Sequence, residues 1–193
     1  MQQTLIILSS ISVLISYGIY EWSIITGRTK PHRTTRFVLL LITALGTASL
    51  FASHDRVAIW LIGLSGLNCF IVFLLSLKYG MGGWAKTDIL CLVIALAGIV
   101  VWKITDRPAL GLYAAILADF AGMVPALLKT YRLPETEYWL SYIFDVAAAI
   151  LTLFAIRNWG LTDFSYPLYL VVINALMLAL TFRPKSIPKP VRT

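Results

Sequence analysis

Four polar side chains stand inside long apolar stretches and are the residues of this chain best suited to chemistry. Asn68, Asp119, Asp145 and Asn174 each lie 8 to 12 residues from the charged residues that flank their stretches. At a helical rise of about 1.5 Å per residue, this spacing places all four near the middle of a lipid bilayer. An ionised carboxylate at that depth costs about 2.5–3.5 kcal/mol. The pattern therefore predicts a polar cavity at the midplane, the depth at which secondary transporters bind solutes.

The two aspartates are candidates for proton or cation coupling. No lysine or arginine lies at their depth in the sequence to neutralise them, so we expect both carboxyls to be protonated at rest. A carboxyl that takes up and releases a proton is what proton-coupled transport needs. Glu21, nearer the end of the first stretch, is a third candidate. Its alternatives are a side chain that reaches the membrane interface and an ion pair with Arg28.

The two asparagines are candidates for contacts with a solute. For each, the alternative is an interhelical hydrogen bond worth about 0.6 kcal/mol. Tyr142 precedes Asp145 by one helical turn, so it could reach the same cavity and is a third candidate for solute binding.

The fifth apolar stretch combines a proline with a stripe of small residues. Pro125 frees the carbonyl of Ala121, which lipid tolerates only where the carbonyl faces protein or a wet cavity. We therefore expect a hinge at Pro125, with a static kink as the alternative. Ala114, Ala118 and Gly122 recur every four residues, a spacing that lets neighbouring helices approach closely.

Seven apolar stretches account for most of the chain, and each is long enough to cross a bilayer as a helix. Hydrophobic residues make up 59% of the 193 residues, and the mean hydropathy is +0.83. A soluble domain of this size could not bury so much apolar surface. The predicted fold class is therefore all-α, a polytopic membrane protein with seven transmembrane helices. The stretches are residues 4–20, 37–53, 57–77, 88–105, 108–128, 138–157 and 164–182.

Lysines and arginines are divided unequally between the two sets of connecting segments. One set of alternate segments holds twelve of them, and the other holds four, together with three aspartates. The positive-inside bias then places the N-terminus outside and the C-terminus in the cytoplasm. The expected location is a bacterial inner (plasma) membrane. The net charge of +7 follows from this bias, so the lipid bilayer is the expected partner and nucleic acid is not. A homo-oligomer stays open.

The order of the stretches indicates a weak internal repeat. Arg28 and Pro31 recur as Arg132 and Pro134, 104 and 103 residues later, and the two candidate asparagines are 106 residues apart. Repeats of three helices joined by a linker helix are one construction of secondary transporters, and chance similarity of apolar segments is the alternative. The expected single membrane domain comprises repeats at 4–77 and 108–182, a linker helix at 88–105 and a basic cytoplasmic tail at 183–193.

Enzymatic function is not indicated. His32 and His54 fall on opposite sides of the predicted membrane and cannot share a site. The sequence contains no zinc-protease, nucleophile-elbow, P-loop or dinucleotide-binding motif, and Cys69 and Cys91 form no Cys-x-x-Cys pair. No catalytic residue, metal site or cofactor is therefore predicted. A membrane enzyme built on the two aspartates stays open as an alternative.

The segment 122–137, GMVPALLKTYRLPETE, resembles the PQ-loop superfamily, which includes the SWEET sugar transporters and the lysosomal and vacuolar amino-acid exporters. In both, a helix-borne proline precedes a basic turn that contains proline, and Pro125-Ala126 stands where the family has Pro-Gln. The resemblance implies seven helices arranged as three, one and three, with the N-terminus outside. By position, it also implies that Asn68 and Asn174 line the solute pocket and that Asp119 serves proton coupling.

Two functions of different classes follow from the sequence. The first is a small secondary transporter for a small polar solute, such as a sugar or an amino acid, with proton coupling. The second is a membrane module that transports nothing, such as an assembly factor or a sensor, whose basic cytoplasmic loops recruit a partner or anionic lipid. A water-reachable cavity at the midplane distinguishes the first from the second.

Overall fold

The computed structural model describes residues 2–53, 56–83, 85–104, 108–157 and 160–184, without the side chains of 45–53, 56–63, 102, 103, 108, 111 and 162. The described residues form seven α-helices and one short 3-10 helix, and no strand, so they are all-α, as the sequence predicts. Of the expected tail at 183–193, residues 185–193 lie outside this description. The elements are α1 (Gln2–Ile25), α2 (Arg33–Ser53), α3 (Arg56–Tyr79), α4 (Lys86–Ile104), α5 (Pro108–Arg132), η1 (Pro134–Thr136), α6 (Trp139–Ala155) and α7 (Leu161–Thr181).

Each predicted apolar stretch coincides with one helix, but several helices continue into the basic segments. The second helix begins at Arg33 rather than at residue 37, and the fifth continues to Arg132 rather than ending at 128. Arg36 and Lys129, which the sequence assigns to loops, therefore lie inside helices. Hydropathy falls at the first charge, whereas helical hydrogen bonding continues, because lysine and arginine are good helix formers with long side chains.

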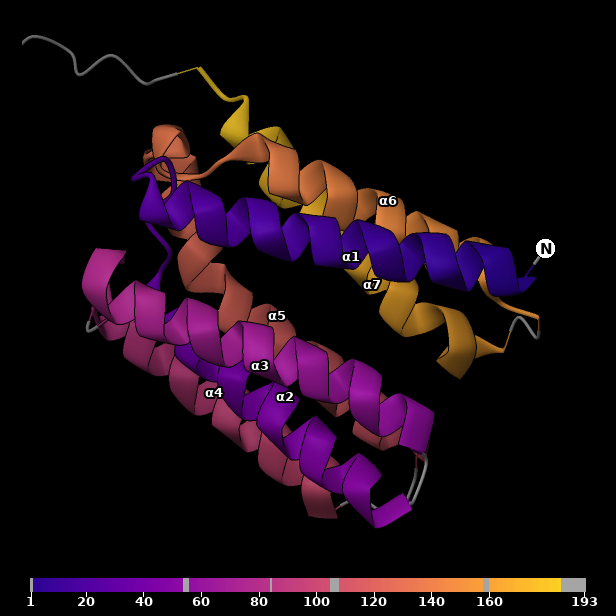
Figure 1. Cartoon of the computed structure of the whole chain (residues 1–193). Coiled ribbons are helices and arrows are strands. Elements are labelled where there is room, and N and C mark those ends of the chain that lie inside the picture. Colours follow the sequence, from indigo (N-terminus) through magenta and orange to yellow (C-terminus); the bar gives the residue numbers. More distant parts are fainter. Residues whose placement is uncertain (1, 54–55, 84, 105–107, 158–159, 185–193) are drawn as a thin grey trace, which may run out of the picture.

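The helices lie side by side in two groups (Figure 1). The first group contains α1, α6 and α7, and the second contains α2, α3, α4 and α5. Between the groups, α1 packs on α3 and α5 packs on α7. The groups are close together at the end that carries segments 26–32, 80–83 and 133–138, and they diverge toward the other end (Figure 1). We name these the basic end and the opposite end.

The packing pattern is unchanged when three pairs of helices are exchanged: α1 with α5, α2 with α6, and α3 with α7. Under this exchange the α2–α3 pair becomes α6–α7, the α1–α6 pair becomes α5–α2, and the α1–α3 pair becomes α5–α7, and all six pairs are in contact. The remaining helix, α4, packs on α5 and α2. The two halves of the chain are thus interleaved, since α1 lies in a group with two helices of the second half.

Polar residues of the helices lie inside, and many large apolar residues lie outside. On α1, Ser9, Ser16 and Ser23 are buried, whereas Ile7 and Leu14 are 58% and 54% exposed. The hydroxyls of these three serines are hydrogen-bonded, as in the contacts from Ser9 and Ser16 to backbone carbonyls of α6. A water-soluble bundle shows the reverse distribution. An outer surface of this kind is typical of helices that meet lipid.

Three helical segments are long and apolar enough to cross a membrane, within the part of the chain that the structure describes. They are Gln2–Ile25, Leu112–Arg132 and Asp163–Thr181. Leu64–Tyr79 and Trp139–Ala155 are apolar but shorter. Length and composition therefore support three spans directly.

Small residues let α4 and α2 approach α5 closely. A Cβ atom built at Gly98 of α4 would lie 3.0 Å from the Ala114 carbonyl oxygen and from the Ala118 Cβ. One built at Gly122 of α5 would lie 2.5 Å from Cγ1 of Val38 on α2. The stripe of small residues predicted on the fifth helix thus lies at its contacts with two neighbours.

Candidate functional site

A row of polar side chains lies between the two groups of helices. Tyr169 of α7 donates a hydrogen bond to the buried Asp119 carboxyl of α5, and the Tyr17 hydroxyl of α1 lies 3.1 Å from Oγ of Ser65 on α3. Both contacts cross from one group to the other. With Asp145 of α6 we name these residues the polar seam. Hydroxyl and carboxyl groups thus hold the two groups together here.

Asp145 is half-buried on the α1 side of the polar seam. The Ser16 hydroxyl is within hydrogen-bonding reach of its carboxyl, and Tyr17 is within electrostatic reach. The two carboxyls have different hydroxyl neighbours, Tyr169 for Asp119 and Ser16 for Asp145. Tyr166 lies near both Asp119 and Tyr17, so tyrosines connect the two carboxyls.

The predicted site residues are staggered along the helices. Asp119 lies 13 residues before the end of α5, whereas Asp145 lies six residues after the start of α6. Measured from the basic end of each helix, these positions differ by about 10 Å at 1.5 Å per residue. Asn68 and Asn174 fall between them. The predicted common depth was counted from the flanking charged residues. The positions differ because the helices extend past those residues by different lengths.

The two asparagines differ in their hydrogen bonding. Nδ2 of Asn174 donates to the carbonyl of Leu170, one turn earlier on α7, at 2.9 Å. Oδ1 of Asn68 is buried and accepts no hydrogen bond from the residues that the structure describes. A buried acceptor without a partner is unfavourable. Asn68 is therefore the asparagine that a bound solute could satisfy.

An apolar layer closes the space between the groups near the basic end. It consists of buried side chains from five helices, among which Ile24, Val72 and Met177 are at most 1% exposed. The rings of Tyr20 and Tyr142 meet edge-on at 6.4 Å within this layer. The structure thus places Tyr142 within the apolar layer, and its hydroxyl is directed toward the basic end.

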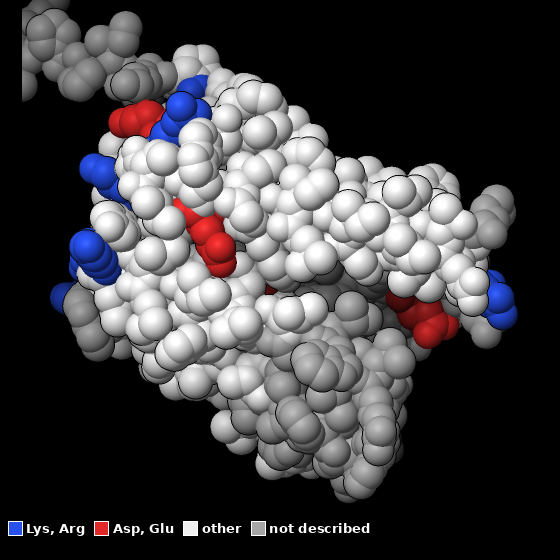
Figure 2. Space-filling view, in the orientation of Figure 1, with Lys and Arg blue, Asp and Glu red and all other residues white. Residues whose placement is uncertain are grey.

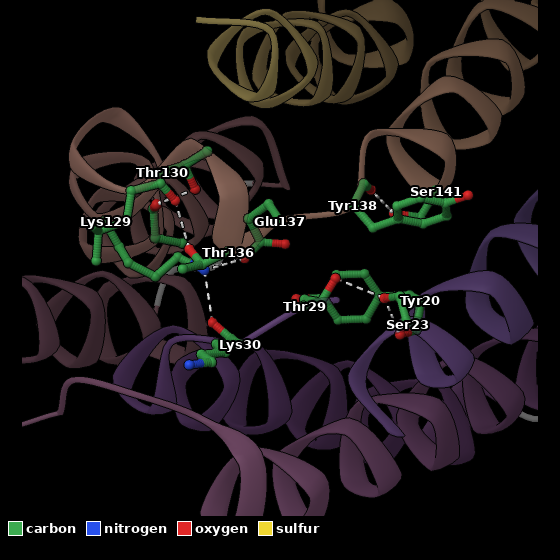
Figure 3. Close-up of polar contacts among 12 residues, drawn as sticks. Tyr20, Ser23, Thr29, Lys30, Lys129, Thr130, Thr136, Glu137, Tyr138 and Ser141 are labelled. Atoms are coloured by element: carbon green, nitrogen blue, oxygen red, sulfur yellow. Dashed lines mark hydrogen bonds and ion pairs between the residues drawn. The ribbon is translucent and has the colours of Figure 1, made fainter. Parts of the chain in front are cut away.

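A buried ion pair lies beyond the apolar layer, at the basic end. Lys129 of α5 pairs with Glu137, and both side chains are almost completely buried, at 5% and 1% exposure. Lys129 also donates to the carbonyl of Lys30 at 2.7 Å (Figure 3). Tyr142 donates to the other Glu137 oxygen at 2.9 Å. We name Lys129, Glu137 and Tyr142 the basic-end cluster.

The connecting segments at the basic end are joined by backbone hydrogen bonds. Lys30 N donates to Thr136 O at 2.9 Å, which joins the α1–α2 segment to η1. Met81 N donates to Pro31 O at 3.0 Å, and Arg33 N to Met81 O at 3.2 Å. The three segments and the basic-end cluster thus form one packed closure.

His32 lies buried within this closure. Its Nε2 is 3.6 Å from Oδ2 of Asp88, which also accepts hydrogen bonds from the backbone of Gly83 and Ala85. Burial lowers the pKa of His32, although the Asp88 carboxylate opposes the shift.

We expect acid to destabilise the closure through His32. As the pH falls below the ordinary histidine value of about 6.5, the unfolded chain takes up a proton before the folded protein does. Stability from neutral His32 is therefore complete above that value and is lost below it. His32→Gln should reduce the fall in melting temperature between pH 7.5 and pH 5.5. An identical fall in both proteins would contradict this origin.

Two further candidates lie on the helices of the site. Glu21 is half-buried. The guanidinium of Arg28, its partner in one of the alternatives, lies over the ring of Trp22, 4.5 Å from the centroid. Pro125 is buried inside α5, which continues past it to Arg132. The chain thus carries a proline within the helix that joins the polar seam to the basic-end cluster.

Sequence reasoning missed several residues of the site. Tyr166 and Tyr169 share one face of α7 by their spacing of three, which could have marked them as inward-facing. Lys129 and Glu137 are eight residues apart across a turn that contains proline, and no helical spacing connects them. Arg36 appeared as one of many basic loop residues, whereas the structure places its guanidinium 4.4 Å from the ring centroid of Tyr20.

The electrostatic surface differs between the two ends. Figure 2 shows most visible lysine and arginine atoms gathered at the basic end. The exposed ones there are Arg28, Lys30, Lys78, Lys86 and Arg132. No cluster of three or more potential metal ligands occurs among the described residues.

Comparisons with protein-family models, curated proteins and solved structures gave no match to this chain. The residues of this chain and their geometry are therefore the evidence for its function.

Proposed function

We propose that this chain is an integral membrane protein whose seven helices all cross the bilayer, arranged as three, one and three. The outward-facing apolar side chains support this arrangement, because water-exposed helices would not carry them. The exchange of helix pairs that preserves the packing pattern supports the repeat. By the positive-inside bias, the basic end faces the cytoplasm of a bacterial cell and the N-terminus lies outside.

We propose further that the protein is a secondary transporter of a small polar solute, related to the PQ-loop superfamily. The observation that carries the proposal is the polar seam, in which the Asp119 and Asp145 carboxyls lie between two groups of helices. The groups meet at the basic end through the apolar layer and diverge toward the opposite end (Figure 1). Such an arrangement is expected of a transporter that is closed to the cytoplasm and open to the outside.

In this proposal the polar seam exchanges protons, and the two asparagines bind the solute. Asp119 takes up a proton from the outside, and Tyr169 stabilises its carboxyl through their hydrogen bond. Asn68 and Asn174 contact the solute, and Asp145 lies further toward the cytoplasm. Release then requires the groups to separate at the basic end, and Pro125 provides a hinge in α5 for that movement.

Asp119→Asn tests the coupling role. An asparagine keeps the size of the side chain and a group that Tyr169 can hydrogen-bond, but it cannot carry a proton. In proteoliposomes loaded with a pH-sensitive dye, proton movement on addition of alanine or glucose should fall to background, at least about 10-fold. Asp163→Asn, an exposed aspartate on α7, is the control and should transport normally. Unchanged proton movement in folded Asp119→Asn protein would refute the coupling role.

Accessibility to water distinguishes transport from a non-transporting membrane module. In a background that lacks Cys69 and Cys91, Asn68→Cys should react with a charged thiol reagent added from the outside. Val72→Cys, one turn further along α3 and inside the apolar layer, should react at least about 10-fold more slowly, because that layer excludes water. Equal unreactivity at both positions would favour the non-transporting module.

A further inference from the structure

Arg36 is a half-buried cation that forms no ion pair with any residue that the structure describes. It lies in the first turn of α2, and its guanidinium is 4.4 Å from the ring centroid of Tyr20 on α1. Its Nε is buried and donates no hydrogen bond to any residue that the structure describes. The two ion pairs among the described residues, Lys129–Glu137 and His32–Asp88, leave Arg36 out.

The surroundings of Arg36 lie inside the bundle, between the polar seam and the basic-end cluster. Asp145 and Glu137 are both within electrostatic reach of the guanidinium, but neither forms an ion pair with it. Glu137 is already committed to Lys129 and Tyr142. A guanidinium with a buried, unpartnered N–H group is stabilised when an anion accepts its hydrogen bonds. The Arg36 guanidinium is therefore able to bind an anion.

The Arg36 guanidinium suits a carboxylate better than other anions. A guanidinium presents parallel N–H donors that match the two oxygens of a carboxylate. Phosphate also accepts from parallel N–H donors. Its second negative charge, however, would be repelled by Asp145 and Glu137, and Arg36 alone would have to offset both charges. A neutral sugar supplies no charge at all.

We infer that the solute carries a carboxylate and that the guanidinium of Arg36 binds it. The inference rests on the proposed transport function, because it names the chemical class of solute at the same site. It covers amino acids and hydroxy acids, which share the carboxylate and differ in the ammonium.

Binding to the purified full-length protein tests the inference. Thermal-shift titrations use a panel of the twenty amino acids, lactate and succinate, with glucose, sucrose and inorganic phosphate as non-carboxylates. We expect at least one carboxylate to raise the melting temperature. Its affinity should fall at least about 30-fold in Arg36→Gln and by an intermediate factor in Arg36→Lys, since a lysine keeps the charge but loses the fork. Arg132→Gln, at an exposed arginine of the basic end, is the control and should bind as the unaltered protein does.

A second measurement uses the unaltered protein, in case Arg36→Gln does not fold. Phenylglyoxal modifies arginines, and mass spectrometry reports each site separately. The carboxylate found above should slow modification of Arg36 at least about 10-fold at saturation and leave Arg132 unchanged, whereas glucose should protect neither.

The possible outcomes distinguish the inferred carboxylate binding by Arg36 from the proposed transport function. Binding of a sugar or phosphate but no carboxylate, or carboxylate binding that Arg36→Gln leaves unchanged, overturns the inference. If the protein then transported a sugar, the proposed transport function would still hold. Arg36-dependent binding of a carboxylate without any movement across proteoliposomes supports the inference as a binding site and overturns the transport function. A panel in which no carboxylate binds or protects Arg36 also overturns the inference.

Discussion

Glu137→Gln is expected to lower the free energy of unfolding by about 3–5 kcal/mol, because it leaves the buried Lys129 without a counter-charge. Both side chains of this pair are within 5% of full burial, so water cannot replace the lost carboxylate. The same change weakens the contact with Tyr142 and loosens the attachment of Lys129 to the Lys30 carbonyl. Thermal or denaturant unfolding of the purified protein measures the effect.

Two matched variants separate this effect from a general effect of removing charge. Glu135→Gln removes an exposed carboxylate two residues away and should change stability by less than about 0.5 kcal/mol. Lys129→Met in the Glu137→Gln background removes the uncompensated cation and should recover part of the loss. A double variant less stable than Glu137→Gln would show that the buried pair is not the cause.

Gly122→Val is expected to separate α2 from α5 and to destabilise the protein by about 1–3 kcal/mol through overpacking. Even the Cβ of this side chain would lie 2.5 Å from Cγ1 of Val38, which is completely buried and has no free direction in which to move. Because α5 carries both Asp119 and Lys129, a displaced α5 should also disturb the polar seam and the basic-end cluster.

The controls for this prediction are a glycine of α1 and the α2 residue that Gly122 contacts. Gly18→Ala adds a Cβ with no atom within 4 Å and should be neutral or stabilising by about 0.5–1 kcal/mol, since alanine favours a helix interior. Val38→Ala combined with Gly122→Val makes room for the new side chain and should restore part of the stability. Full stability of Gly122→Val alone would mean that the α2–α5 contact is not close in solution.

A site residue could be identified from the sequence only where its role does not depend on partners from other helices. Asp119 and Asp145 were found because a carboxyl among apolar residues is visible in the sequence itself. Tyr169, Tyr17 and Arg36 were not, because aromatic and basic residues are common near the ends of membrane helices and their direction depends on neighbouring helices. The Lys129–Glu137 pair forms only after α5, η1 and α6 have brought the two side chains together.

The sequence by itself determined the seven helices, their approximate bounds and the small-residue face of α5, because hydrophobic length and residue spacing are local properties. The tertiary structure decided which helices form each group, how the halves interleave and which polar groups satisfy one another. These depend on packing between residues far apart in the chain, as when α5 of the second group supplies Asp119 to Tyr169 of the first. Long-range contacts of that kind have no signature in sequence spacing, so only the packed bundle shows that Arg36 lies inside it.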